Sequence, residues 1–133
     1  IFDPQTSTLT YSSAGHLPAL LRRGDTGEVI RLSRALGPLL GPFADAVYTQ
    51  CTVDVEPGDV LVMYTDGLVE HHDEDLRAGI AHLEQVIAAW PPGALLDCEA
   101  LARDVAPSPH ADDLCLLVVR FGEENSTDYL SPD

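Results

Sequence analysis

Lysine is absent from the 133-residue sequence, and the seven basic residues are all arginines scattered along the chain. The 22 Asp and Glu residues therefore leave a formal net charge of −15 at pH 7. Binding to a nucleic-acid backbone or to an anionic membrane surface requires clustered Lys and Arg. The composition argues against both partners. It favours cations or a basic partner, unless the acidic residues simply form a solvated surface.

Cysteine is also scarce. Cys51, Cys98 and Cys115 are odd in number, lie far apart and form no Cys-x-x-Cys pair, so neither a zinc knuckle nor a disulfide framework is expected. Each has mostly apolar neighbours, which predicts buried, reduced thiols and a cytoplasmic location. Long apolar runs are missing too, and the N-terminus lacks the layout of a signal peptide, so no membrane segment is expected.

Methionine occurs once, at Met63, and the sequence begins at Ile1. We therefore expect this chain to be a piece of a longer polypeptide. With 45% hydrophobic residues it should fold around a single core. The predicted domain covers residues 1–121, and the polar, acidic residues 122–133 are predicted to form a disordered tail.

Six segments have the short apolar or alternating pattern of β-strands: residues 8–14, 19–23, 28–32, 47–55, 60–64 and 114–121. The second and third flank Gly24-Asp25-Thr26-Gly27, which predicts a β-hairpin. The fourth and fifth flank the turn Glu56-Pro57-Gly58-Asp59, which predicts a second hairpin whose later strand is buried on both faces.

Helical periodicity begins at about Asp73 and continues to Trp90, where Pro91-Pro92-Gly93 ends it. Residues 95–105 form a second amphipathic segment. The order of several antiparallel strands, two helices and a final strand predicts an α+β fold with the helices packed on one face of a sheet.

Carboxylates stand where the two most apolar strands end. Asp66 follows the strand 60–64 and is followed by Gly67, which lets a ligand approach the backbone. Asp112 and Asp113 directly precede the strand 114–121. If these strands are neighbours, three carboxylates converge, and their repulsion requires a bound cation or raised pKa values. The pattern indicates a site for a hard cation.

Simpler interpretations remain open. An Asp-Gly pair after a strand is often only a turn, and Asp112-Asp113 could be solvated turn residues. The pair His71-His72 is not expected to bind metal, because adjacent side chains point in different directions. His16 and His110 are candidates for contacting phosphate or hydrogen-bonding to metal ligands.

Four strings stand in a characteristic order, with the predicted first hairpin between the first two: Ala14-Gly15-His16-Leu17-Pro18, Pro38-Leu39-Leu40-Gly41, Pro57 to Glu70, and Asp112 to Arg120. Together they resemble the later half of a bacterial phosphatase domain of the SpoIIE/RsbU type. That group belongs to the metal-dependent PP2C-like protein phosphatases, the PPM superfamily. The resemblance covers the chain from about Leu9 to Phe121.

The resemblance implies a partial α-β-β-α sandwich of two stacked antiparallel sheets, and a binuclear Mn²⁺ or Mg²⁺ centre. Asp66 and Asp112 would be metal ligands, and Asp113 would be an alternate ligand or a group that supports the ligands. Gly67 would serve the backbone geometry. In such enzymes two cations activate a water molecule that attacks phosphoserine or phosphothreonine.

The chain also departs from the family's pattern. The early Gly-Asp with a closely following second Asp is absent, as are the first strands of the domain. We therefore expect weak or single metal occupancy, little activity from this polypeptide, and an uncovered sheet face or edge that favours a homodimer or domain swapping. The resemblance suggests a phosphorylated STAS-domain anti-sigma-factor antagonist as substrate. The alternatives are a non-catalytic pseudophosphatase that serves as a regulatory or interaction module, and an unrelated acidic cation-binding domain.

Overall fold

The computed structural model describes residues 1–70, 75–91, 93–94, 96–106 and 113–122. Its elements, in chain order, are β1 (Phe2–Asp3), β2 (Thr8–Tyr11), β3 (Ser13–Ala14), β4 (Leu20–Arg22), β5 (Val29–Arg31), β6 (Leu36–Gly37), β7 (Cys51–Asp54), β8 (Val60–Tyr64), the 3₁₀ turn η1 (Asp66–Leu68), α1 (Leu76–Ala89), α2 (Cys98–Val105) and β9 (Leu116–Arg120). The predicted α+β class with two helices is confirmed.

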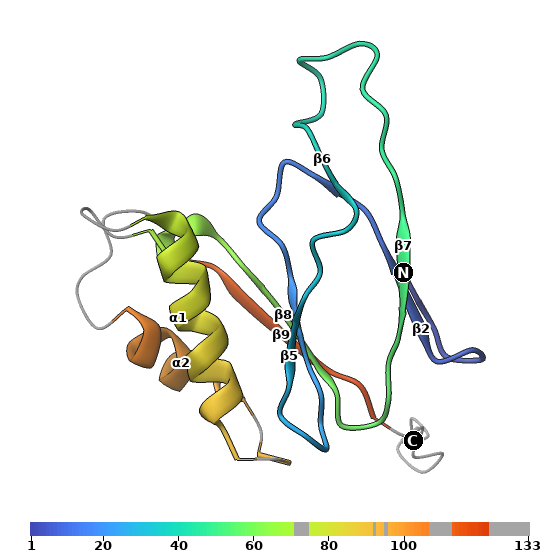
Figure 1. Cartoon of the computed structure of the whole chain (residues 1–133). Helices are drawn as coiled ribbons and strands as arrows, with labels where there is room; N and C mark the ends of the chain where they lie inside the picture. The colour runs from blue at the N-terminus through green and yellow to red at the C-terminus, as the bar shows by residue number, and fades with distance from the viewer. Residues whose placement is uncertain (71–74, 92, 95, 107–112, 123–133) are drawn as a thin grey trace, which may run out of the picture.

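The strands form two antiparallel sheets and one small parallel pair. One sheet has the strand order β5-β4-β8-β9, the other has the order β1-β2-β7, and β3 pairs with β6 in parallel. Both helices lie on the same face of the four-stranded sheet, and the three-stranded sheet lies on its other side (Figure 1). The layers are therefore helices, sheet and sheet.

Alternation along β4 explains how one sheet serves two cores. Leu20 belongs to the cluster between sheet and helices, together with Val62, Leu83 and Ile87. The next residue, Leu21, belongs to the cluster between the two sheets. Successive side chains of a strand point to opposite faces, so the apolar run builds both cores.

The first predicted hairpin is confirmed, because β4 pairs with β5 in antiparallel register. The second is wrong. β7 pairs with β2, whereas β8 pairs with β4 and β9, so the two consecutive strands belong to different sheets. The turn Glu56–Asp59 is a corner between sheets rather than the end of a ribbon.

The corner is held by the buried carboxylate of Asp59, which is 1% exposed. Arg23 Nη1 donates to Asp59 Oδ2 over 2.6 Å, and the backbone N–H groups of Gly24 and Glu56 donate to its two oxygens over 2.9 and 3.0 Å. A carboxylate with these three donors is stabilised in a buried position where an unpaired one is not. Asp59 thereby fixes the corner to the β4–β5 hairpin.

Other predictions need smaller corrections. The strand predicted over 8–14 divides at Ser12 into β2 and β3, which belong to different sheets. β8 is not buried on both faces, since Met63 is 37% exposed. Leu117 and Val119, on the same face of β9, are 52% and 38% exposed. The uncovered apolar sheet face expected from the sequence is thus present.

The helices begin where aspartates cap them. Asp75 accepts from the N–H of Arg77 at the start of α1, and Asp97 accepts from the N–H of Glu99 at the start of α2. Both helices therefore start about three residues later than predicted. No helix in the described part of the chain is long and apolar enough to span a membrane.

The cysteine prediction was wrong about burial. All three thiols are free, but Cys51 is only half-buried, and Cys98 and Cys115 are exposed. Apolar neighbours in sequence do not determine which face of a strand a side chain occupies. The predicted tail lies almost wholly outside the described residues, apart from Gly122, and the domain boundary at residue 121 stays a prediction.

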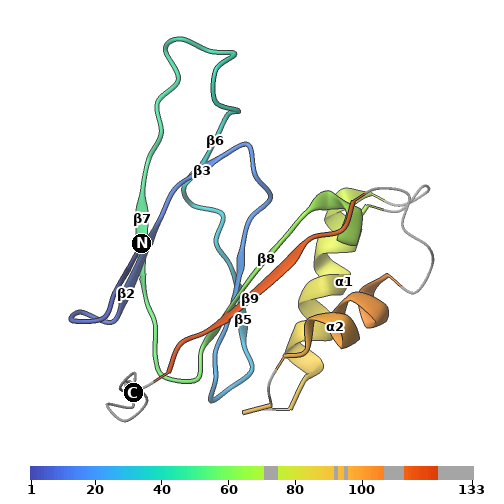
Figure 2. The same ribbon diagram turned by 180° about the vertical axis from the view of Figure 1, so that it is seen from behind.

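Residues 38–50, between β6 and β7, extend away from both sheets (Figures 1 and 2). They include the string Pro38-Leu39-Leu40-Gly41, and their exposed apolar side chains are Leu39, Leu40, Phe43 and Val47.

Replacing Asp59 by Ala should lower the free energy of unfolding by roughly 3 kcal/mol, because Arg23 and two backbone donors lose their acceptor. Urea denaturation measures the change. Asp54→Ala, at an exposed position of β7, is the control and should have an effect within about 0.5 kcal/mol. Equal losses for the two variants would contradict the role given to Asp59.

Candidate functional site

Thr65 joins the ends of β8 and β9. Its N–H donates to the carbonyl oxygen of Cys115 over 3.0 Å, one step beyond the last regular pair, Tyr64 with Leu116. Its hydroxyl accepts from the N–H of Cys115 over 2.9 Å and donates to the carbonyl oxygen of Asp113 over 3.0 Å. The two apolar strands are therefore neighbours, as the sequence analysis required, and residues 65 and 113–115 are fixed together.

Asp66 begins η1 directly after this clamp. Its backbone oxygen accepts from the N–H groups of Val69 and Glu70 over 2.8 and 2.7 Å, and its Oδ1 accepts from the N–H of Gly67 over 3.0 Å. The Asp66 side chain is exposed, whereas Gly67 and Val69 are buried. A firmly held backbone thus presents a carboxylate to solvent, with its second oxygen unbonded within the described residues.

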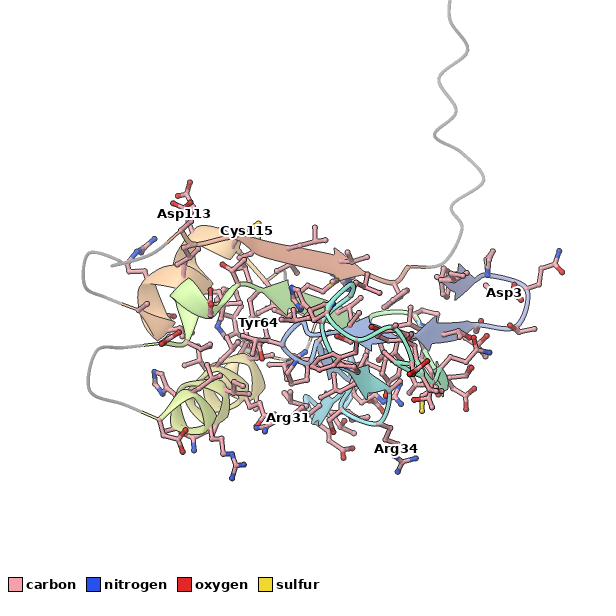
Figure 3. All side chains as sticks on the ribbon, turned by 90° about the horizontal axis from the view of Figure 1, so that it is seen from above. Asp3, Arg31, Arg34, Tyr64, Asp113 and Cys115 are labelled. Atoms are coloured by element: carbon pink, nitrogen blue, oxygen red, sulfur yellow. The ribbon has the colours of Figure 1, made fainter. Side chains whose placement is uncertain are left out.

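Asp113 is exposed at the start of the segment leading into β9. Its side chain points away from the sheet, at the same end of β9 as Cys115 (Figure 3). Asp112 lies outside the described residues, as do His71, His72 and His110. The predicted ligand set is therefore only partly visible, through Asp66 and Asp113.

These residues fit part of a cation site. Carboxylate oxygens are the donors that Mg²⁺ and Mn²⁺ prefer, and Asp66 and Asp113 provide them from adjoining backbone segments. Within the part of the chain that the structure describes, no group of three or more His, Cys, Asp or Glu could enclose a metal. The described residues thus offer two carboxylates of the predicted set but no complete metal cage.

His16 and Gly67 differ in their relation to Asp66. Gly67 contacts the carboxylate directly through its N–H. His16 is exposed in the loop after β3; its Nδ1 lies 2.8 Å from the carbonyl oxygen of Leu17, and no hydrogen bond to Asp66 is present among the described residues. It lines a cavity of about 590 Å³ together with Met63. The structure does not link His16 to the carboxylates.

An ion pair and a buried tyrosine lie between the four-stranded sheet and α1. Arg31 on β5 donates from Nε and Nη2 to the two carboxylate oxygens of Glu84 over 2.7 and 2.8 Å, and this hydrogen bonding raises the pKa of Arg31. Tyr64 belongs to the cluster between sheet and helices, and its buried hydroxyl has no hydrogen-bond partner among the described residues (Figure 3). Burial raises the pKa of Tyr64 to about 12.

Thr65 is a functional residue that the sequence patterns did not indicate. Its hydroxyl hydrogen-bonds to the backbone of the neighbouring segment, as backbone groups would if the strands were longer. The residues it bonds to lie about 50 positions away in the sequence. The only local signal was a hydroxyl residue between a buried strand and Asp66.

Comparison with known proteins gives consistent matches. The model of the family "Stage II sporulation protein E (SpoIIE)" matches residues 1–122. Protein IcfG of Synechocystis sp. is 30% identical over 70 residues, which cover 53% of this chain and 11% of IcfG.

Solved structures match over most of the chain. The RsbU and RsbW domains of Rv1364c from Mycobacterium tuberculosis superpose with a TM-score of 0.72 at 24% identity, over 91% of this chain and 35% of that one. The Mn-presoaked phosphatase domain of the cell fate determinant SpoIIE from Bacillus subtilis superposes with a TM-score of 0.67 at 18% identity. The match covers 92% of this chain and 55% of that one. The chain thus spans about a third to about half of these structures, which share its fold.

Thr65→Val removes the hydroxyl but preserves the shape of the side chain. We expect it to cost about 1 kcal/mol and to raise amide exchange at Cys115 about tenfold, because that N–H loses its acceptor. Hydrogen exchange with residue resolution measures both effects. Thr52→Val, which removes an exposed hydroxyl pair with Thr10, is the control and should leave Cys115 unchanged. Unaltered exchange at Cys115 in Thr65→Val would show that the clamp is absent.

The raised pKa of Tyr64 predicts a specific loss of stability in alkali. The Tyr64 hydroxyl loses its proton near pH 10.0 in the unfolded chain and near pH 12 in the folded chain. The contribution of the buried, neutral Tyr64 to the free energy of unfolding is therefore fully present below pH 10 and is lost as the pH rises towards 12. Urea midpoints of wild type should therefore fall more steeply across this interval than those of Tyr64→Phe. Parallel curves would refute the burial of an ionisable Tyr64. Below pH 9 the difference in urea midpoint between wild type and Tyr64→Phe should not depend on pH.

Proposed function

Because the chain belongs to the Stage II sporulation protein E (SpoIIE) family, whose domains are PP2C-type phosphatases, we propose that it forms part of a metal-dependent serine/threonine protein phosphatase. One observation carries the proposal. Thr65 fixes the segment bearing Asp66 to the segment bearing Asp113, so the backbone positions that carry these two carboxylates lie at the same end of the neighbouring strands β8 and β9.

In this proposal Asp66 and Asp112 bind Mn²⁺ or Mg²⁺, and Asp113 is an alternate ligand or supports the other two. The chemistry that the bound cations supply is activation of a water molecule and neutralisation of phosphoryl charge. The chain's own residues hold the carboxylate oxygens in place for the cations. Gly67 orients one oxygen of Asp66, and the turn that follows leaves the other oxygen available to a cation.

The proposed substrate is a phosphorylated STAS-domain anti-sigma-factor antagonist in the cytoplasm, and its basis is family resemblance alone. A homodimer has a structural basis in the apolar face that Met63, Leu117 and Val119 expose.

A non-catalytic regulatory module is the second candidate. A pseudophosphatase would keep the layered fold and the Thr65 clamp without turnover.

Asp66→Asn and Asp112→Asn, each made in the intact protein, should reduce Mn²⁺-dependent phosphate release from a phosphoserine peptide by at least about 100-fold. The fold should remain as stable or become slightly more stable, because carboxylate repulsion is relieved. His71→Ala and His72→Ala are the controls and should retain wild-type metal dependence. Unchanged turnover in both Asn variants would refute the assignment, and an inactive wild-type protein would favour the pseudophosphatase.

A further inference from the structure

Arg22 on β4 is a buried cation that the proposed site does not use. It is 2% exposed, and within the described residues it has no ion pair with a carboxylate. Its hydrogen bonds go to backbone carbonyl oxygens instead: Nε donates to Ile87 over 3.1 Å, Nη2 to Trp90 over 2.6 Å, and Nη1 to Arg23 over 3.4 Å. A buried charge is costly unless its surroundings compensate it, so these contacts must serve that purpose.

The carbonyls of Ile87 and Trp90 belong to the C-terminal end of α1. That end carries partial negative charge and unpaired carbonyl groups, and the last turn of α1 contains no basic residue of its own. Arg22 therefore provides from the sheet the cation that the helix lacks. Gly27, at φ +75°, leaves room for it, because a Cβ there would lie 3.3 Å from Arg22 Nη2.

The opposite end of α1 rests on the segment that holds Asp66. A Cβ added to Gly79 would lie 1.9 Å from the carbonyl oxygen of Val69, so the helix backbone packs directly against that residue. The N–H of Val69 in turn donates to the backbone oxygen of Asp66 over 2.8 Å. One helix thus contacts Arg22 at its end and the carboxylate-bearing turn at its beginning.

The middle of α1 leaves little freedom for compensating movement. Ile80 and Leu83 are buried against the sheet, and Glu84 forms the two-bond pair with Arg31. A 14-residue helix is about 21 Å long and behaves as a rigid rod on this scale. Loss of the contact at one end is therefore transmitted as a shift or tilt at the other.

We propose that Arg22 is a positioning residue for the cation site: by capping the C-terminus of α1 it holds the helix that supports the Asp66 turn. This inference rests on the proposed function for its metal readout, but its backbone readout is independent of metal. A purely structural Arg22 would alter stability without a selective effect on residues 66–69.

The test compares Arg22→Met, Arg22→Lys and the control Leu21→Ala in the intact protein. Methionine fills the space without charge, and lysine keeps the charge with fewer donors. Leu21 is the neighbouring residue on β4 and packs in the other core, away from α1. Leu21→Ala thus supplies a loss of stability that does not involve the helix cap.

Three readouts are needed: the dissociation constant of Mn²⁺ from paramagnetic resonance, amide exchange at Gly67 to Val69, and the emission of Trp90, the only tryptophan. We expect Arg22→Met to weaken Mn²⁺ binding about tenfold, as loss of a ligand-supporting contact does. Exchange at Gly67 to Val69 should rise and Trp90 emission should shift. Arg22→Lys should be intermediate, and Leu21→Ala should change none of the three selectively.

An Mn²⁺ affinity within about twofold of wild type, together with unchanged exchange at Gly67 to Val69, would overturn the inference even if Trp90 emission shifts. The inference would also be overturned if Leu21→Ala changed Mn²⁺ affinity and amide exchange at Gly67 to Val69 as much as Arg22→Met does, at the same overall loss of stability. If wild type binds no Mn²⁺, the proposed function fails. The amide exchange at Gly67 to Val69 then decides by itself whether Arg22 positions the Asp66 turn through α1. If Arg22→Met does not fold, Arg22→Lys is judged by the same criteria.

Discussion

The antiparallel pairing of β8 with β9 is the interaction on which the rest of the candidate site depends. Its register runs from Val60 opposite Arg120 to Tyr64 opposite Leu116, and Thr65 continues it by one further step. A slip of one residue would turn every β8 side chain to the other face and separate the ends that the Thr65 hydroxyl joins. The apolar faces on both sides oppose such a slip, because Val62 and Tyr64 fit only the helix-facing core.

Two arginines, the buried Arg22 and the half-buried Arg23, connect this sheet to the layers on its two sides. Arg22 and Arg23 are consecutive, so their side chains leave the strand in opposite directions. Arg22 binds the end of α1, and Arg23 binds Asp59 at the corner between the sheets. The strand β4 thereby fixes the helix layer and the second sheet at nearly the same point. Apolar packing alone is not directional, whereas these hydrogen bonds specify where each layer sits.

Local sequence patterns predicted what depends on local causes. Most of the strands, both helices and the β4–β5 hairpin follow from periodicity and turn residues, whereas β1 and β6 were not predicted. The site prediction was conditional on β8 and β9 being neighbours, and the structure meets that condition. The failures involve distant partners. Asp59 makes residues 56–59 a corner through donors about 35 positions away, and Thr65 acts on residues about 50 positions away. Cys115 was expected to be buried because its neighbours are apolar, yet it is exposed in the segment before β9, where its N–H donates to Thr65. Nothing near Arg22 in the sequence distinguishes it from a surface arginine.

Several of the few basic residues are used inside the fold. Arg22, Arg23 and Arg31 are engaged in contacts between layers, which leaves four arginines exposed: Arg34, Arg77, Arg103 and Arg120. Asp59 and Glu84 neutralise Arg23 and Arg31, so the surface keeps the strong negative charge that the composition indicates, and such a field raises the local concentration of cations. A diffuse field cannot choose where a cation binds. That choice requires a carboxylate whose backbone cannot move, and Asp66 is held by Thr65 on one side, by Gly67 and Val69 on the other, and by α1 behind them.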